Sequence, residues 1–278
     1  MDVERKTAAL TARFHPLSAD RRPPRVRVLE HDPDLGQGLD EAQWRAALAT
    51  ATAPLFLHER GPWRFFPAPE PGSLGALVLR GTILLTIGVH GRGHVEVLGA
   101  GDVISPWVGD DAELSLPTVV AAHAISELRL ALLEREFTRR SAPWPEIHAA
   151  LLRRVISRTR RLALQSAINS LPRIEDRVEL TLWQLAHRFG RVTPAGFSFQ
   201  LRLTHSQLAG MVAAQRPSVS VALARLNDAG RVRRGGRDQW LLPGPFPATL
   251  ADLVAQSGLP PGPWRTCDPS SLVGLDRS

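Results

Sequence analysis

The side chains best suited to specific chemistry lie near the C-terminal end of the chain, in the closely spaced Gln215, Arg216 and Ser218. They open a segment whose apolar residues recur at helical spacing. An arginine guanidinium can donate two parallel hydrogen bonds to guanine O6 and N7, which is worth about 1–3 kcal/mol of discrimination against a wrong base. Glutamine and serine can add contacts to base edges or to phosphates. This pattern favours the reading of base edges in a DNA major groove.

The surrounding segment predicts the elements that would position these side chains. Thr204 is a natural N-cap, and Gln207 three residues later completes a capping box for a first short helix. A second helix follows a tight turn and ends at Gly230. Two short apolar strands around Gly235 and Gly236 then predict a hairpin. We therefore expect residues 172–243 to form a winged helix-turn-helix domain.

Other polar side chains of this region are better placed to bind phosphates than bases. The candidates are Thr204, His205, Ser220, Arg225 and, in the wing, Arg233. The local charge supports this prediction. From Arg135 to Leu242 there are 19 arginines against 7 acidic residues, a balance of 19 − 7 = +12, although the whole chain carries only +7. Such a basic half suits a polyanionic partner.

Composition excludes several other classes of protein. Cys267 is the only cysteine, so an intramolecular disulfide, a cysteine-ligated iron–sulfur cluster and a cysteine-rich zinc site are excluded. The sequence has no apolar run of membrane-spanning length and no signal-peptide core, which predicts a cytoplasmic protein without a membrane partner. No nucleophile–base set is recognisable, so we do not expect an enzyme.

The region before the helix-turn-helix predicts an α+β protein with an N-terminal antiparallel β-roll. Residues 53–142 contain short apolar or alternating runs separated by glycine, proline and aspartate, which is typical of a roll or sandwich. Residues 1–52 are expected to be an N-terminal extension with loops at Pro23-Pro24 and 31–38. Residues 244–278 are expected to be a tail, with one possible short helix at 249–256.

Residues 143–171 predict one long helix, because no glycine or proline interrupts the chain between Pro145 and Ser170. About 25 residues at 1.5 Å each span about 37 Å, which exceeds a small roll. The helix has two apolar faces. One could pack on the roll and the other on a second copy of the chain, so we expect a homodimer; the alternative is a helix buried within one subunit.

These features together resemble the Crp/Fnr family of transcription regulators. The resemblance rests on LTHSQLAGMV and RPSVSVALARL in the helix-turn-helix, on LPRIEDRV after the long helix, and on VLRG and LGAGDV in the roll. It covers about residues 53–242. It implies a cyclic-nucleotide-binding-like roll and a homodimer that binds a palindromic operator together with RNA polymerase. Half-sites would then lie about one helical turn apart.

The sequence departs from the family pattern at two positions of the motif. The family often has Glu after the recognition arginine, whereas this chain has Pro217, so we expect a different half-site. The family often has Gly in the turn, whereas this chain has Ala213. A positive φ at that alanine would cost about 1 kcal/mol.

The effector site differs from the family pattern more strongly. The phosphate-binding arginine of cyclic-nucleotide-binding members has no counterpart, since no arginine occurs between Arg92 and Arg129. Three acids, Asp110, Asp111 and Glu113, lie near its expected place. The resemblance therefore does not predict binding of cAMP in the usual mode, and a constitutive regulator without an effector is one alternative.

A second alternative is a cyclic dinucleotide effector. Arg154, Arg158 and Arg161 recur at helical spacing and could clamp its phosphates, and Trp107 could stack a base; a solvated basic face is the simpler interpretation. A third is a roll that binds a haem or another small molecule through His58, His90, His94 or His123, or a metal through His90 and His94 with Glu96. Their spacing fits no usual metal motif, so no metal is predicted.

Overall fold

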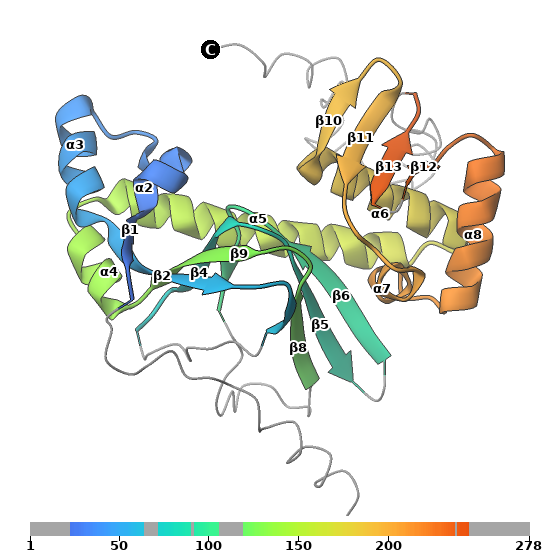
Figure 1. The fold of residues 1–278 in the computed structure, drawn as a ribbon, viewed down its shortest axis with the longest axis horizontal. Coiled ribbons are helices and arrows are strands. Elements are labelled where there is room, and N and C mark those ends of the chain that lie inside the picture. The colour runs from blue at the N-terminus through green and yellow to red at the C-terminus, as the bar shows by residue number, and fades with distance from the viewer. Residues whose placement is uncertain (1–22, 64–71, 90–91, 106–118, 237, 245–278) are drawn as a thin grey trace, which may run out of the picture. The chain divides into compact units, whose positions relative to one another are not determined.

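The computed structural model describes residues 23–63, 72–89, 92–105, 119–236 and 238–244 (Figure 1). These residues form two compact units. The first contains the described residues of Met1–Leu85, Val97–Leu116 and Val120–Arg158. The second contains those of Thr86–Glu96, Val119 and those of Thr159–Ser278.

The first unit is built on a five-stranded antiparallel sheet with the strand order β1-β2-β9-β4-β7. Its strands are β1 (Arg25–Arg27), β2 (Thr52–His58), β9 (Leu128–Leu133), β4 (Gly75–Arg80) and β7 (Val103–Ile104). Cross-strand pairs such as Leu55 opposite Ala131 and Val78 opposite Leu130 fix the register. Both faces of the central strands are buried, since the neighbouring residues Leu77 and Val78 of β4 point to opposite faces and are both almost fully buried.

A four-stranded sheet has the order β3-β8-β5-β6. Its strands are β3 (Gly61–Trp63), β8 (Val119–Ala124), β5 (Ile83–Val89) and β6 (Arg92–Leu98). The two sheets confirm the predicted β-roll. The sequence did not indicate β1, β3 or β7, because strands of two or three residues show no alternation.

Residues 23–51 contribute to the core of the first unit. They form β1, α2 (Val28–His31), the short helix η1 (Pro33–Gly36) and α3 (Glu41–Thr50), which starts at a capping box between Asp40 and Gln43. Leu35 is fully buried, so the predicted loop at 31–38 is wrong where η1 forms. Val28 and Leu29 are also fully buried, against Phe137 and Ile147. A sequence interpretation could not see this, because the burial depends on contacts made far along the chain.

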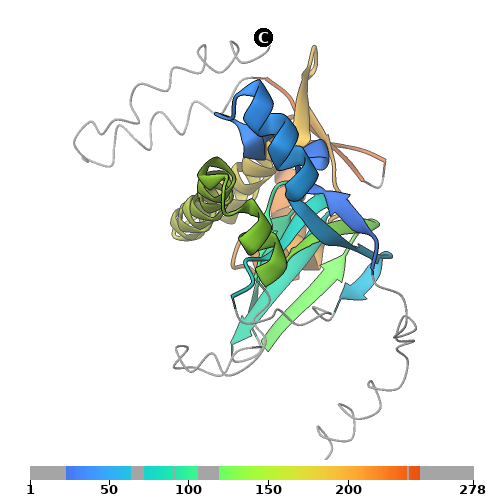
Figure 2. The same cartoon turned by 90° about the vertical axis from the view of Figure 1, so that its left-hand side faces the viewer.

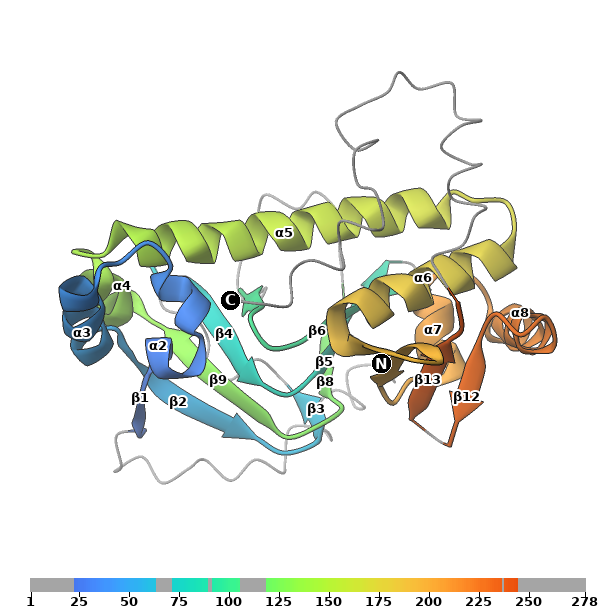
Figure 3. The ribbon, with the colours of Figure 1, turned by 90° about the horizontal axis from the view of Figure 1, so that it is seen from above.

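Two further helices complete the first unit and lead out of it. Figure 2 shows α4 (Arg135–Ser141) beside α3. Figure 3 shows α5 (Pro145–Asn169) as one uninterrupted helix, as predicted. Ile147 and Leu151 of α5 are buried in the first unit, whereas Leu152 and Ile156 are 59% and 41% exposed. The helix therefore has one packed apolar face and one apolar face that the described residues leave uncovered.

The second unit contains the predicted winged helix-turn-helix. Its elements are α6 (Ile174–Phe189), β10 (Gly190–Thr193), β11 (Gly196–Gln200), α7 (His205–Met211), α8 (Arg216–Asp228), β12 (Arg233–Gly235) and β13 (Gln239–Leu242). The sheet order is β10-β11-β13-β12. β11 pairs with β10 on one side and with β13 on the other. Trp240 is fully buried, and its Nε1 donates to the Leu201 carbonyl at 2.9 Å.

Within the described residues, no helix is long and apolar enough to cross a membrane. The possible helix at 249–256 lies outside the described residues.

Candidate nucleic-acid interface

The first helix of the motif begins as its sequence predicts. The Gln207 N–H donates to Thr204 Oγ1 at 3.2 Å, and the Thr204 N–H donates to Gln207 Oε1 at 2.8 Å. This reciprocal pair is the capping box, and it satisfies two N–H groups that a helix start would otherwise leave without partners. The packed side of α7 consists of buried Leu208 and Met211. Thr204 itself stays exposed at the entry to the helix.

The turn between the two helices bends at Ala213, which has a φ of 51°. Among the described residues it is the only non-glycine residue with a positive φ. An L-residue in this conformation is strained by about 1–2 kcal/mol, because its Cβ approaches the following carbonyl oxygen. The backbone strain expected from the sequence is therefore present at Ala213, where the family often has glycine.

The second helix presents the predicted base-reading residues at its start. Gln215 is the N-cap of α8, and Arg216 is its first residue; both side chains are exposed. Pro217 lies in the first turn, where it removes no helical hydrogen bond. Ser218 is half-buried. The packed side of α8, which includes Val219 and Leu226, holds this start in place against the rest of the unit.

His205 links α7, α8 and the wing. Its Nδ1 lies 2.8 Å from Ser220 Oγ, and the Ser220 hydroxyl donates to the Arg216 carbonyl at 3.1 Å. Its Nε2 lies 3.3 Å from a guanidinium nitrogen of Arg234. Nδ1–H must therefore donate to Ser220, while Nε2 accepts from Arg234. Burial, reinforced by the charges of Arg234 and Arg216, lowers the pKa of His205 and favours this neutral tautomer.

The wing adds cations beside this network. Arg233 on β12 is exposed. The Arg234 guanidinium lies 4.6 Å from the centre of the Trp240 ring, a cation–π contact that orients it. Arg225 on α8 is exposed but ion-paired with Glu175 of α6 at 2.6 Å. To contact a phosphate, Arg225 would have to leave Glu175 or bind both anions at once.

A buried amide network, not foreseen from the sequence, holds the end of α7. Gln165 Nε2 of α5 donates to the Met211 carbonyl at 3.1 Å and to Thr181 Oγ1 at 3.0 Å. Asn169 Nδ2 donates to the same carbonyl at 3.1 Å. Gln165 is only 6% exposed. A polar pair four residues apart near the C-terminal end of α5 was the available signal, but its partner could not be identified from local sequence.

A second buried contact joins α6 to the segment after α8. Glu179 is 3% exposed and ion-pairs with Arg231, whose Nε donates to Glu179 Oε1 at 2.9 Å. Burial raises the pKa of Glu179, and the Arg231 charge opposes that rise. The pair fixes the end of α8 against α6, which sets the orientation of the reading helix.

The predicted effector residues lie on a half-buried face of α5. Arg154 is hydrogen-bonded to Asp32 Oδ1 at 2.9 Å and lies 3.5 Å from Asp34 Oδ2. Arg158 donates to the Val103 carbonyl at 3.4 Å. These two arginines of the first unit therefore lie against the 99–103 segment and the N-terminal acids rather than on a solvated face.

Only some of the remaining effector and metal candidates lie among the described residues. Arg161 is half-buried, and Trp107 lies outside the described residues, as do His90 and the three acids at 110, 111 and 113. His58, His94 and His123 are described, and the part of the chain that the structure describes has no group of three or more potential metal ligands.

Comparison with known proteins finds relatives of the C-terminal domain and of a larger part of the chain. Residues 176–243 match the family model described as a Crp-like helix-turn-helix domain. The chain is 29% identical over 179 residues to the CRP-like cAMP-activated global transcriptional regulator of Mycobacterium tuberculosis, covering 62% of this chain and 77% of that protein.

Solved structures show the same fold at lower identity. FixK2 from Bradyrhizobium japonicum superposes with a TM-score of 0.55 and 19% identity, covering 72% of this chain and 96% of that one. The c-di-GMP responsive global regulator CLP of Xanthomonas campestris gives 0.53 and 19%, covering 74% and 100%. Residues 176–243 thus match a Crp-like helix-turn-helix domain, the chain is similar to a curated CRP-like transcription regulator, and its fold is shared with solved structures of such regulators.

Proposed function

We propose that this protein binds a two-fold-symmetric DNA operator as a homodimer, with α8 of each subunit in the major groove. The observation that carries the proposal is the exposed start of α8, where Arg216 is held through its carbonyl by Ser220 and, through Ser220, by His205. In helix-turn-helix proteins the first residues of the second helix contact base edges. Arg216 would read a guanine, with Gln215 and Ser218 beside it.

Phosphate contacts would set the register of the motif on the duplex. The candidates are Thr204 and His205 at the start of α7, Ser220 and Arg225 on α8, and Arg233 on the wing. Because each neutralised phosphate releases counterions, affinity should fall steeply with salt. Pro217 offers no acceptor for cytosine, so the preferred half-site should differ from that of family members with Glu at this position.

The uncovered face of α5 supports the homodimer. Leu152, Val155 and Ile156 on this face are exposed in the single chain, and Leu164 further along is 53% exposed. An apolar stripe of this length on a soluble helix indicates a protein interface. A dimer formed through α5 would carry two reading helices and contact half-sites about 34 Å apart. It would act with RNA polymerase in the cytoplasm, as expected for the family.

We propose that the effector, if a cyclic dinucleotide, competes with the chain's own acids. Asp32 and Asp34 hold Arg154, so an incoming phosphate must displace them. The alternative is a constitutive regulator, since Asp32 and Asp34 already pair with Arg154 without any ligand. No arginine replaces the missing phosphate ligand between Arg92 and Arg129, so cAMP is not expected to bind in the family's usual mode.

Binding measurements with a selected operator test the DNA-binding proposal. Arg216→Ala should lower affinity for the operator by about 10- to 100-fold, the equivalent of about 1–3 kcal/mol, and leave non-specific binding nearly unchanged. The matched control is Arg45→Ala, which removes an exposed arginine on α3. Retention of full operator affinity by Arg216→Ala would contradict the proposed docking.

A further inference from the structure

The outward side of α8 is apolar over its first two turns. The packed side of this helix consists of four buried residues, Val219, Ala222, Leu223 and Leu226. At 3.6 residues per turn, the positions opposite to them are Pro217, Val221 and Ala224, and all three are exposed. We call these three residues the apolar line. Val221 is its largest branched side chain and is 52% exposed.

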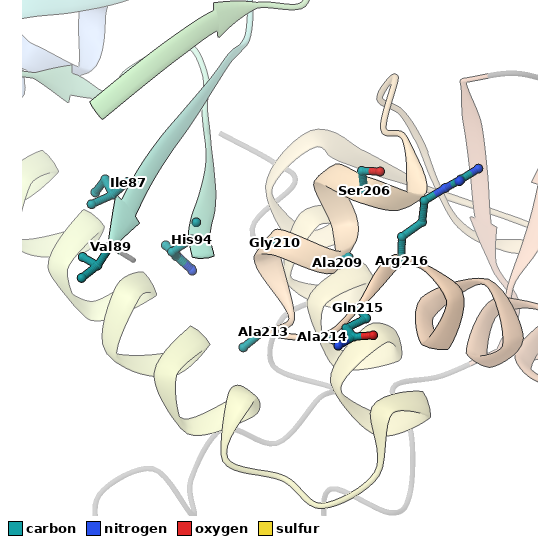
Figure 4. A pocket seen from close by; sticks show the side chains of 11 residues that line it. Ile87, Val89, His94, Ser206, Ala209, Gly210, Ala213, Ala214, Gln215 and Arg216 are labelled. Atoms are coloured by element: carbon teal, nitrogen blue, oxygen red, sulfur yellow. The ribbon is translucent and has the colours of Figure 1, made fainter. Parts of the chain in front are cut away.

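Polar side chains lie along both edges of the apolar line. Arg216 and Ser220 follow one edge, and Ser218 and Arg225 follow the other, as their spacing on the helix requires. The close view in Figure 4 shows Arg216 at the start of α8, with its side chain extended away from the turn residue Ala213. A narrow apolar strip between cationic edges matches a surface that is apolar in the middle and anionic on both sides.

The major groove of DNA can present such a surface. Its edges are the phosphates, and its floor carries the polar edges of the bases together with the C5-methyl group of each thymine. Val221 has no donor or acceptor in its side chain. Against a polar base edge it would displace water without replacing the lost hydrogen bonds, which is unfavourable. Against a thymine methyl group, both partners withdraw apolar surface from water, which is favourable.

The position of Val221 on the helix limits where this thymine can lie. Val221 follows Arg216 by five residues, which is a rise of about 7.5 Å along the helix, or about two base-pair steps of 3.4 Å. The thymine should therefore lie within about three base pairs of the guanine that Arg216 contacts. Ala224 lies one turn further along and carries a single methyl group, so Val221 supplies the larger apolar contact.

We infer that Val221 is a specificity-determining residue, which selects a thymine in each half-site by contact with its C5-methyl group. The inference rests on the proposed DNA-binding function and adds a second base to the guanine of Arg216. The preference comes from one methyl group, so each contact should contribute about 3- to 5-fold in affinity.

Deoxyuridine substitution in the operator tests the inference directly. Uracil lacks the methyl group of thymine and keeps all of its hydrogen-bonding groups. With the operator selected by the wild-type protein, each thymine near the guanine is replaced by uracil, one at a time, in one half-site. One of these duplexes should bind the wild type about 3- to 5-fold more weakly than the thymine duplex.

Val221→Ala should bind that uracil duplex and the thymine duplex almost equally. Alanine is a better helix former than valine, so α8 should remain folded. The salt dependence of operator binding should match that of the wild type, because no phosphate contact is lost. Val192→Ala is the matched control, since it makes the same substitution at a valine that is 75% exposed on β10, and it should keep the wild-type preference for thymine over uracil.

The possible failures separate the inference from the proposed function. Equal affinity of the wild type for the thymine duplex and every uracil duplex would overturn the inference alone and would favour a protein partner for the apolar line. A loss on uracil substitution that is the same in wild type and Val221→Ala would also overturn it, because another residue would then contact the methyl group. A wild type that selects no duplex, or selects one that Arg216→Ala binds equally well, would instead overturn the proposed function, and the inference with it.

Discussion

His205 Nδ1 and Ser220 Oγ lie 2.8 Å apart and join the first helix of the motif to the second. Through the Ser220 hydroxyl this contact reaches the Arg216 carbonyl, and through His205 Nε2 it reaches Arg234 on the wing. A neutral imidazole therefore organises three elements that should meet DNA. The arrangement makes the stability of the motif sensitive to pH in the range where histidine titrates.

Acidification should weaken the folded motif through His205. Its pKa is lower in the folded protein than the ordinary value of 6.5, so the unfolded chain binds more protons around and below that pH. The free energy of unfolding therefore decreases as pH falls from about 7.5 to about 5.5. For His205→Asn, urea unfolding should show a smaller decrease in the free energy of unfolding over this pH range, because the other titrating groups contribute equally to both proteins. Identical pH dependence in the two proteins would refute the role of this contact.

Ala213→Gly should stabilise the protein. Glycine tolerates the φ of 51° without the Cβ clash, and after its extra unfolded-state entropy the gain is about 0.5–1 kcal/mol. The control is Ala224→Gly in the exposed middle of α8, which should lose about 1 kcal/mol. Thermal or urea unfolding measures both. Destabilisation by both substitutions would show that the turn is not strained.

Arg231→Ala should destabilise the second unit by about 2–3 kcal/mol. It leaves the buried Glu179 carboxylate without its main counter-ion, and the partial exposure of Arg231 keeps the loss toward the low end for a broken buried pair. Arg231→Lys keeps the positive charge, so its free energy of unfolding should decrease less. Urea unfolding at neutral pH gives the values, and a loss below about 0.5 kcal/mol for Arg231→Ala would argue that water already compensates Glu179.

Leu152→Glu with Ile156→Glu should convert the dimer to a monomer. Both side chains lie on the uncovered face of α5, and a carboxylate there would be desolvated in a helix–helix interface. Sedimentation velocity measures the mass. Val192→Glu is the control, since this side chain is 75% exposed and belongs to β10 rather than to α5. A wild-type protein that sediments as a monomer would contradict the proposed homodimer.

Asp32→Asn should strengthen binding of a cyclic dinucleotide if Arg154 is its phosphate ligand. The substitution removes the carboxylate that holds the guanidinium. A thermal-shift titration with cyclic di-GMP should then show a larger stabilisation for the variant, approaching about 2.7 kcal/mol at 100 times the Kd. Absence of any shift in both proteins would exclude this nucleotide and favour the constitutive alternative.

The helix-turn-helix could be predicted from sequence almost residue by residue because its signals are local. The capping pair of Thr204 and Gln207, the small turn residue Ala213 and the stop at Gly230 each act within a few residues of the chain. The long helix was predictable for the same reason. Residues 23–51 were not, since burial of Leu35 depends on packing partners such as Phe137, about a hundred positions away in the chain.

The site's supporting contacts were also beyond sequence reasoning. Gln165 gains its role from the Met211 carbonyl, 46 residues away. Gly210 carried a weak signal, because an isolated glycine inside a helix often marks close packing. Only the three-dimensional arrangement shows that a hairpin of the β-roll packs against it.

Selection of binding sites from a random duplex pool tests the central claim most directly. The wild-type protein should enrich a two-fold-symmetric sequence whose half-sites lie one helical turn apart, with a guanine in each that Arg216→Ala no longer selects. Enrichment of no sequence, or of the same sequence by both proteins, would contradict the assignment of α8 as the reading helix.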